Sequence, residues 1–158
     1  MKLNKRTVGL FTLVLISLSL GAFSSGAVGA AARGEDTKAG PPVEYVTAEE
    51  LKAKLAKNEP VTIIDVRGSV GIESDNKIKG AVYVKLRKLK SRLAMPPLST
   101  VPRDREVVTY CACPNDESSI RAAQLLTESG FKRVRVLKGG WVTWKRANGQ
   151  VEPFAKGI

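Results

Sequence analysis

Short apolar runs, separated by polar segments with glycine and proline, set the pattern of this chain. Residues 61–66 form a β-branched run bounded by proline and glycine, which is typical of a buried strand. Residues 81–84 and 106–110 repeat this composition, and residues 133–137 alternate basic and apolar side chains, as a strand with one buried face does. The pattern therefore predicts at least four strands.

Apolar residues at helical spacing predict helices between these strands. Thr47 and Glu50 have the spacing of a capping box, in which each side chain binds a free backbone N–H at the start of a helix. That helix is expected to end just before Pro60. Three further helices are predicted at 86–93, 119–128 and 141–147.

Strands and helices alternate along the chain without a tight hairpin signal. This alternation is typical of an α/β fold, with a mostly parallel sheet covered by helices on both faces. Ligands of such sheets bind at the carboxyl ends of the strands. We therefore expect the functional side chains directly after a predicted strand.

The N-terminal part of the chain differs in composition from the rest. Residues 1–32 have a basic start, an apolar run at 8–20 and then small residues, which predicts a cleavable secretory signal peptide. The alternative is a retained membrane anchor, but the strictly apolar run is shorter than the ~20 residues that a span needs. Residues 33–42 are expected to be a flexible leader, and residues 43–158 the folded domain. The predicted location is therefore periplasmic or secreted, with no stable membrane span after cleavage.

The chain carries 26 basic and 15 acidic side chains, a formal net charge of +11. Such a charge favours anionic partners in general. Export argues against nucleic acid as the partner, and the basic residues are interspersed along the chain. A solvated basic surface is the simpler interpretation.

The chemistry of the chain is concentrated in its only two cysteines, Cys111 and Cys113. They lie between the strand at 106–110 and the helix predicted from Ser119. A helix N-terminus offers free backbone N–H groups and a positive dipole end, both of which favour a reactive thiolate. The chain has no histidine, which excludes Cys–His catalysis and histidine metal ligands. Two thiolates alone are a poor zinc site, so we expect no metal and no cofactor.

The residues after the cysteines form the predicted loop around the thiols. Ser118 and Ser119 are expected to cap the helix. Asp116 and Glu117 would repel an anionic substrate and raise the pKa of a nearby thiol, although acidic residues are also common at a helix start. The candidate site therefore contains Cys111, Cys113, Pro114, Asn115, Asp116, Glu117, Ser118 and Ser119.

Several segments, in their order and spacing, resemble the rhodanese-like sulfurtransferase domain from about residue 45 to residue 153. The resemblance implies a three-layer α/β fold. The matching segments are Ile63-Ile64-Asp65-Val66-Arg67, Asn76-Lys77-Ile78-Lys79-Gly80-Ala81, Tyr110-Cys111, and the closing Gly130-Phe131, Val134, Leu137, Gly139-Gly140 and Trp144.

The active loop departs from the common form of that family. Lys77 stands where the family has a histidine, and no arginine precedes the helix serine. In many members the nucleophile is the first residue of a six-residue loop that ends just before that serine, and this loop length places the nucleophile at Cys113. The position at the strand end places it at Cys111 instead. The sequence leaves both open.

The resemblance implies an enzyme that carries sulfur as a cysteine persulfide. The donor would be a thiosulfate-like anion or a mercapto acid, and the acceptor a thiol, another nucleophile, or a redox or sulfur-carrier protein. Asp65 and Arg67 are expected to form a structural ion pair or a loop clamp, with donor binding as the alternative. Two other functions remain open: thiol–disulfide exchange by Cys111 and Cys113, and a catalytically inactive binding module. A tyrosine phosphatase is disfavoured, because the arginine that would grip phosphate is absent from the loop.

Overall fold

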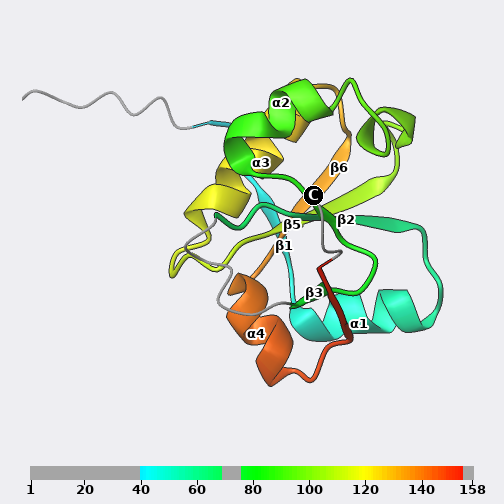
Figure 1. Cartoon of the computed structure of the whole chain (residues 1–158), viewed down its shortest axis with the longest axis vertical. Helices are drawn as coiled ribbons and strands as arrows, with labels where there is room; N and C mark the ends of the chain where they lie inside the picture. The colour runs from blue at the N-terminus through cyan, green and yellow to red at the C-terminus, as the bar shows by residue number, and fades with distance from the viewer. Residues whose placement is uncertain (1–39, 69–75, 155–158) are drawn as a thin grey trace, which may run out of the picture. The chain divides into compact units, whose positions relative to one another are not determined.

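The computed structural model describes residues 40–68 and 76–154. Its centre is a five-stranded sheet with the strand order β1-β6-β5-β2-β4 (Figure 1). Every neighbouring pair in it is parallel. This confirms the parallel α/β sheet predicted from the sequence. The strands are β1 (Glu44–Val46), β2 (Val61–Asp65), β4 (Val82–Tyr83), β5 (Glu106–Tyr110) and β6 (Arg133–Leu137).

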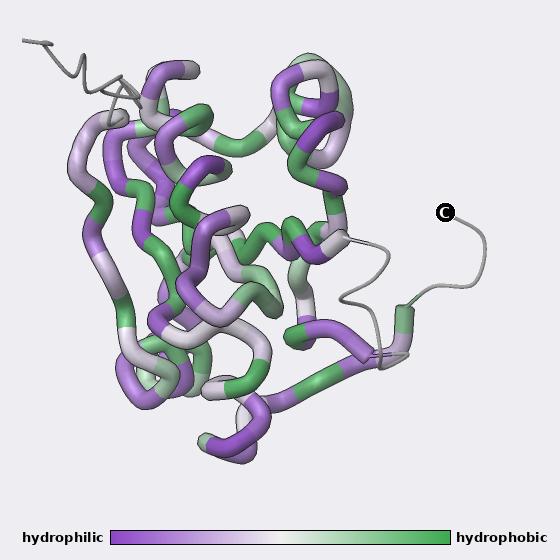
Figure 2. The backbone as a smooth tube through the Cα atoms, turned by 90° about the vertical axis from the view of Figure 1, so that its left-hand side faces the viewer, coloured by the Kyte–Doolittle hydropathy of each residue, from purple (hydrophilic) through white to green (hydrophobic). Residues whose placement is uncertain are grey.

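Helices cover both faces of the sheet, which gives three layers (Figure 1). One apolar core joins the sheet to α1 (Ala48–Ala56) and α4 (Gly140–Arg146). The other core joins it to α2 (Leu89–Arg92) and α3 (Glu117–Glu128). Hydrophobic and hydrophilic residues alternate along the helices in Figure 2, as expected for helices with one buried face. Short 3₁₀ helices, η2 (Leu86–Lys88) and η3 (Leu98–Thr100), flank α2.

The predicted capping box is present at the start of α1. The Glu50 backbone N–H donates to Thr47 Oγ1 at 3.1 Å, and the Thr47 N–H donates to Glu50 Oε2 at 2.8 Å. Two of the free N–H groups at the helix start are thereby satisfied. The helix ends at Ala56, ahead of Pro60 as predicted.

Three short strands were not predicted. They are β1 and an antiparallel pair outside the main sheet, β3 (Asn76–Ile78) with β7 (Val151–Pro153). Each has three residues, too few to show a period. The strand predicted at 81–84 is reduced to the two residues of β4, and α3 begins at Glu117, two residues before the predicted Ser119.

The predicted signal peptide lies outside the described residues, and so do residues 33–39 of the predicted leader. The domain boundary at residue 43 stays a prediction. Within residues 40–68 and 76–154, no helix combines the length and the apolar character that crossing a membrane requires.

Candidate active site

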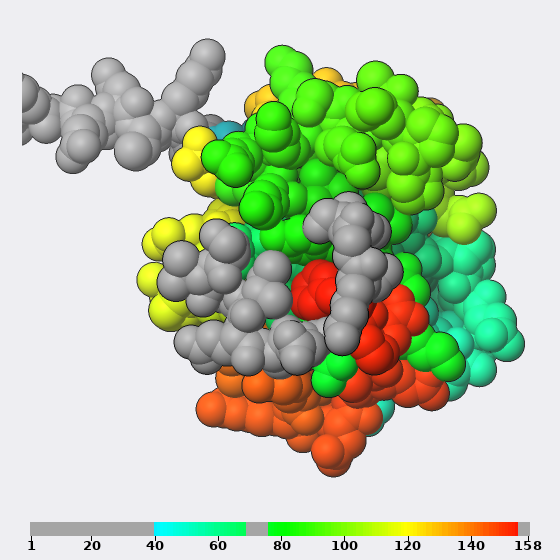
Figure 3. All heavy atoms as spheres, viewed as in Figure 1, coloured from blue at the N-terminus to red at the C-terminus, as the bar shows by residue number. Residues whose placement is uncertain are grey.

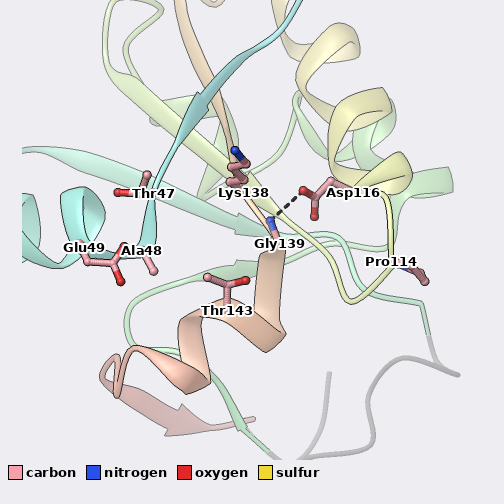
Figure 4. Close-up of a pocket in the computed structure, with 8 residues that line it drawn as sticks. All are labelled: Thr47, Ala48, Glu49, Pro114, Asp116, Lys138, Gly139 and Thr143. Atoms are coloured by element: carbon pink, nitrogen blue, oxygen red, sulfur yellow. Dashed lines mark hydrogen bonds between the residues drawn. The ribbon is translucent and has the colours of Figure 1, made fainter.

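The loop of residues 111–116 connects the end of β5 to the start of α3, at the carboxyl edge of the parallel sheet. The turn before α4 holds the loop in two places. The Trp141 backbone N–H donates to the Cys111 carbonyl oxygen at 2.9 Å, and the Gly139 N–H donates to Asp116 Oδ2 at 2.8 Å (Figure 4). Gly140 lies between them with φ +49°, and a Cβ there would come within 2.2 Å of the Cys111 carbonyl oxygen. This turn therefore requires glycine for both conformation and space.

Cys111 is fully buried in the core under α3. Its Sγ accepts hydrogen bonds from the Cys113 backbone N–H at 3.3 Å and from Ser119 Oγ at 3.5 Å. Burial raises the pKa of the Cys111 thiol, and these hydrogen bonds offset only part of that effect. Cys111 is therefore held as a neutral thiol that solvent does not reach.

Cys113 is partly exposed, and its Sγ lies 3.2 Å from Ser118 Oγ. Partial burial opposes ionisation, but hydrogen bonds outweigh it and lower the pKa of the Cys113 thiol. The donors are the Ser118 hydroxyl, the Cys111 thiol and the Ser118 backbone N–H, while the negative charge of Glu117 acts in the opposite direction. The two cysteines thus differ in solvent exposure and in the direction of their pKa shifts, and Cys113 has the character of a nucleophile.

Asp116 shapes the loop rather than opposing the thiol directly. It adopts a left-handed conformation, with φ 56°, immediately before α3, and its carboxylate is buried against the turn at Gly139. Its carbonyl oxygen accepts a hydrogen bond from Ser119 Oγ at 2.8 Å. The negative charge of Glu117 acts to raise the pKa of the Cys113 thiol, as predicted from the sequence. Pro114 and Asn115 are exposed at the tip of the loop.

An open pocket of about 460 Å³ lies beside the loop (Figure 4). The loop contributes Pro114 and Asp116 to this pocket, and neither cysteine lines it. Its lining residues come from the start of α1, the loop, the turn before α4 and α4 itself: Thr47, Ala48, Glu49, Pro114, Asp116, Lys138, Gly139 and Thr143.

Asp65, the last residue of β2, and Arg67, two residues later, form the predicted ion pair. Arg67 Nη2 lies 2.7 Å from Asp65 Oδ2, and both side chains are fully buried. The Tyr110 hydroxyl donates to the same carboxylate oxygen at 2.7 Å, and the guanidinium stacks 4.3 Å from the Trp141 ring centroid. Arg67 Nη2 also donates to the Asn76 carbonyl oxygen at 2.8 Å. This pair therefore clamps the segments beneath the active loop.

Lys77 occupies the position of the family's histidine, and it is engaged elsewhere. Its ammonium group binds the carboxylate of Glu152 and the carbonyl oxygen of Ala81. It thereby joins β3 to β7.

The role of the turn at 138–141 was not predicted from the sequence. The glycine pair at 139 and 140 entered only as part of the family resemblance, and its contact with a loop more than twenty residues earlier follows from the packing of α4 against the sheet. Glu152 was also missed, because its partner Lys77 lies 75 residues away along the chain.

Comparison with known proteins relates this chain to one family. A sulfurtransferase from Allochromatium vinosum is 31% identical over 104 residues, covering 66% of this chain and 90% of that protein. The thiosulfate sulfurtransferase GlpE of Coxiella burnetii is 33% identical over 102 residues, with coverages of 64% and 88%.

A solved structure shows the same relationship. The crystal structure of the Alr3790 protein from Anabaena sp. is 34% identical, covers 69% of this chain and 82% of its own, and has a TM-score of 0.59. The family model described as "Rhodanese-like domain" matches residues 47–147, which include β2, β5, the cysteine loop and α4. Fold and sequence agree, and the chain therefore belongs to the rhodanese-like domain family.

Proposed function

We propose that this protein is a sulfurtransferase that carries sulfur as a persulfide on Cys113. The observation that carries the proposal is the environment of Cys113, a partly exposed thiol within 3.2 Å of Ser118 Oγ at the start of α3. Similarity to proteins named as sulfurtransferases, at about 30% identity, supports the same reaction class. Cys111 does not suit this role, because its sulfur is fully buried.

The reaction with thiosulfate balances with one thiolate and no cofactor. The Cys113 thiolate attacks the outer sulfur of thiosulfate, the S–S bond of the donor breaks, and sulfite leaves with the electron pair. A nucleophilic acceptor then attacks the outer sulfur of the persulfide and regenerates the Cys113 thiolate. A thiosulfate-like donor is favoured because the relative from Coxiella burnetii is named a thiosulfate sulfurtransferase.

The residues of the loop have distinct roles in this proposal. Ser118 stabilises the negative charge on sulfur, first on the thiolate and then on the persulfide, through its hydroxyl and its backbone N–H. Asp116 fixes the loop to the turn before α4. Asp65 and Arg67 act as a positioning pair, because neither side chain reaches solvent.

The test is the intact mass of reduced protein after exposure to thiosulfate. We expect a gain of one sulfur that cyanide removes as thiocyanate. Cys113→Ser is expected to abolish the gain, whereas Cys111→Ser is expected to retain it. A gain that persists in Cys113→Ser and disappears in Cys111→Ser would move the nucleophile to Cys111. The absence of any gain in all three proteins, each shown to be folded, would refute sulfurtransfer from thiosulfate.

We further propose that the protein is exported, on the strength of the basic, apolar and small-residue pattern of residues 1–32. Expression of the whole gene in a bacterium, followed by cell fractionation and mass measurement, tests this. The expected product lies outside the cytoplasm and begins after Ala30 or Ala32. A full-length product in the cytoplasmic fraction would contradict export.

A further inference from the structure

The buried thiol of Cys111 has no evident role in simple sulfur transfer. It is fully buried, so no donor or acceptor molecule reaches it from solvent. The Cys113 backbone N–H donates to its sulfur at 3.3 Å, which places the Cys111 sulfur against the residue that carries the partly exposed thiol. Cys113 is the only other cysteine of the chain and lies in the same loop.

From this arrangement we propose that Cys111 resolves the persulfide on Cys113, releasing hydrosulfide and leaving a Cys111–Cys113 disulfide. This second activity depends on the persulfide of the proposed function. It would make the protein a sulfide-releasing enzyme that uses a dithiol, in addition to a sulfur carrier.

The step balances without an oxidant. The Cys111 sulfur attacks Cys113 Sγ, the inner sulfur of the persulfide, and the bond to the outer sulfur breaks. The proton of the Cys111 thiol passes to the departing sulfur, which leaves as hydrosulfide. The sulfane sulfur is reduced and the two cysteines are oxidised. An external dithiol reductant then reduces the disulfide by exchange and restores both thiols.

The hydrogen bonds of the loop suit this order of events. Burial raises the pKa of Cys111, whereas at Cys113 hydrogen bonds, those of Ser118 first, outweigh partial burial and lower the pKa, so Cys111 is the thiol that keeps its proton more firmly. In the persulfide the negative charge moves to the outer sulfur, which is then available to accept the proton. Ser119 Oγ lies 3.5 Å from the Cys111 sulfur, and its one proton, which also reaches the Asp116 carbonyl oxygen at 2.8 Å, can turn to Cys111 as charge develops there during the attack.

The contacts around the loop allow the two sulfurs to join. Only Ala112 separates the two cysteines, and residues 114 and 115 at the tip of the loop are exposed. The backbone of the loop is held at the Cys111 carbonyl oxygen, at the Asp116 carboxylate and at the Cys113 carbonyl oxygen, which accepts from the Asp116 N–H at 3.3 Å. The movement that joins the sulfurs is therefore a rotation of the Cys113 side chain away from Ser118. A disulfide across one intervening residue is strained and therefore easily reduced, as the cycle requires.

The experiment follows reduced protein under anaerobic conditions after one addition of thiosulfate. Intact mass reports the persulfide and the disulfide, and a sulfide-specific reagent reports released hydrosulfide. In the wild type we expect one hydrosulfide for each disulfide formed. In Cys111→Ser and Cys111→Ala we expect no hydrosulfide and a persulfide that lasts at least about tenfold longer, because a neighbouring thiol acts at a high effective concentration.

The outcomes separate this inference from the proposed function. No persulfide in either Cys111 variant, both shown to be folded by circular dichroism, would overturn the function and the inference together. A persulfide of equal lifetime in wild type and variants, without hydrosulfide, would leave sulfur transfer intact and overturn the resolving role. Disulfide formation at the same rate without thiosulfate would also overturn it, because the persulfide would then not be the source of oxidation.

Discussion

Ser118 and Glu117 are neighbours in the first turn of α3, and they act on the Cys113 thiol with opposite signs. The Ser118 hydroxyl, 3.2 Å from Cys113 Sγ, favours the thiolate by hydrogen bonding. The Glu117 carboxylate opposes the thiolate by charge repulsion. The reactivity of the thiol is therefore a balance between two adjacent side chains, and either can be changed without altering the sulfur.

We predict that Ser118→Ala raises the pKa of Cys113 and that Glu117→Gln lowers it. At a pH below the pKa, Ser118→Ala then alkylates more slowly than the wild type and Glu117→Gln more quickly. The measurement is the pH dependence of iodoacetamide modification, mapped to the peptide that contains Cys113. Ser91→Ala is the matched control, since Ser91 is an exposed serine in α2 whose hydroxyl binds only the backbone. A shift of the same sign in both loop variants would contradict this balance.

At the scale of elements, the Tyr110 hydroxyl joins three strands. It donates to Asp65 Oδ2, directly at the end of β2, at 2.7 Å, and accepts from the Ile78 backbone N–H of β3 at 3.1 Å. Tyr110 itself is the last residue of β5 and is fully buried. One hydroxyl thus satisfies a buried carboxylate and a buried N–H directly beneath the cysteine loop.

Tyr110→Phe is predicted to lower the free energy of unfolding by about 1–3 kcal/mol, because it leaves both buried partners without this bond while keeping the ring. Urea denaturation measures the change. Tyr45→Phe is the control, because Tyr45 is 43% exposed and the same atom is removed there from the surface. Equal effects of the two substitutions would show that the buried hydroxyl does not contribute to stability.

The elements differ in how well the sequence predicts them. The residue bounds of β5 and β6 agree with the predicted strands, because five consecutive apolar or alternating residues form a complete pattern. The strands β3 and β7 escaped prediction, since each is three residues long and pairs with a segment far away in the sequence. Local patterns contain no information about such pairing.

The same distinction applies to the candidate site. The position of the two cysteines at a strand end, ahead of a helix, was evident from the sequence. Which sulfur is buried depends on how the chain turns after Tyr110, and that turn is fixed by Gly139 and Trp141, more than twenty residues later. The choice between Cys111 and Cys113 therefore required the structure.

At the scale of the whole molecule, the positive charge is concentrated in one segment, although basic residues also occur along the rest of the chain. Residues 85–92, along η2 and α2, hold five basic side chains and no acidic one. None of the five forms an ion pair with a residue in the described part of the chain. The segment lies at the surface of the face shown in Figure 3, where it is drawn in green. By contrast, at the amino ends of the strands, Arg133, Arg135 and Lys54 surround the buried carboxylate of Glu106.

The turn that holds the cysteine loop also provides an optical signal. Both tryptophans of the protein, Trp141 and Trp144, lie in α4, and the backbone N–H of Trp141 donates a hydrogen bond to the Cys111 carbonyl oxygen. The Trp141 indole is stacked near Tyr110 and rests on the Arg67 guanidinium, so its emission depends on the packing beneath the thiols. The intrinsic fluorescence of this protein is consequently a label-free signal located one hydrogen bond away from the backbone of Cys111.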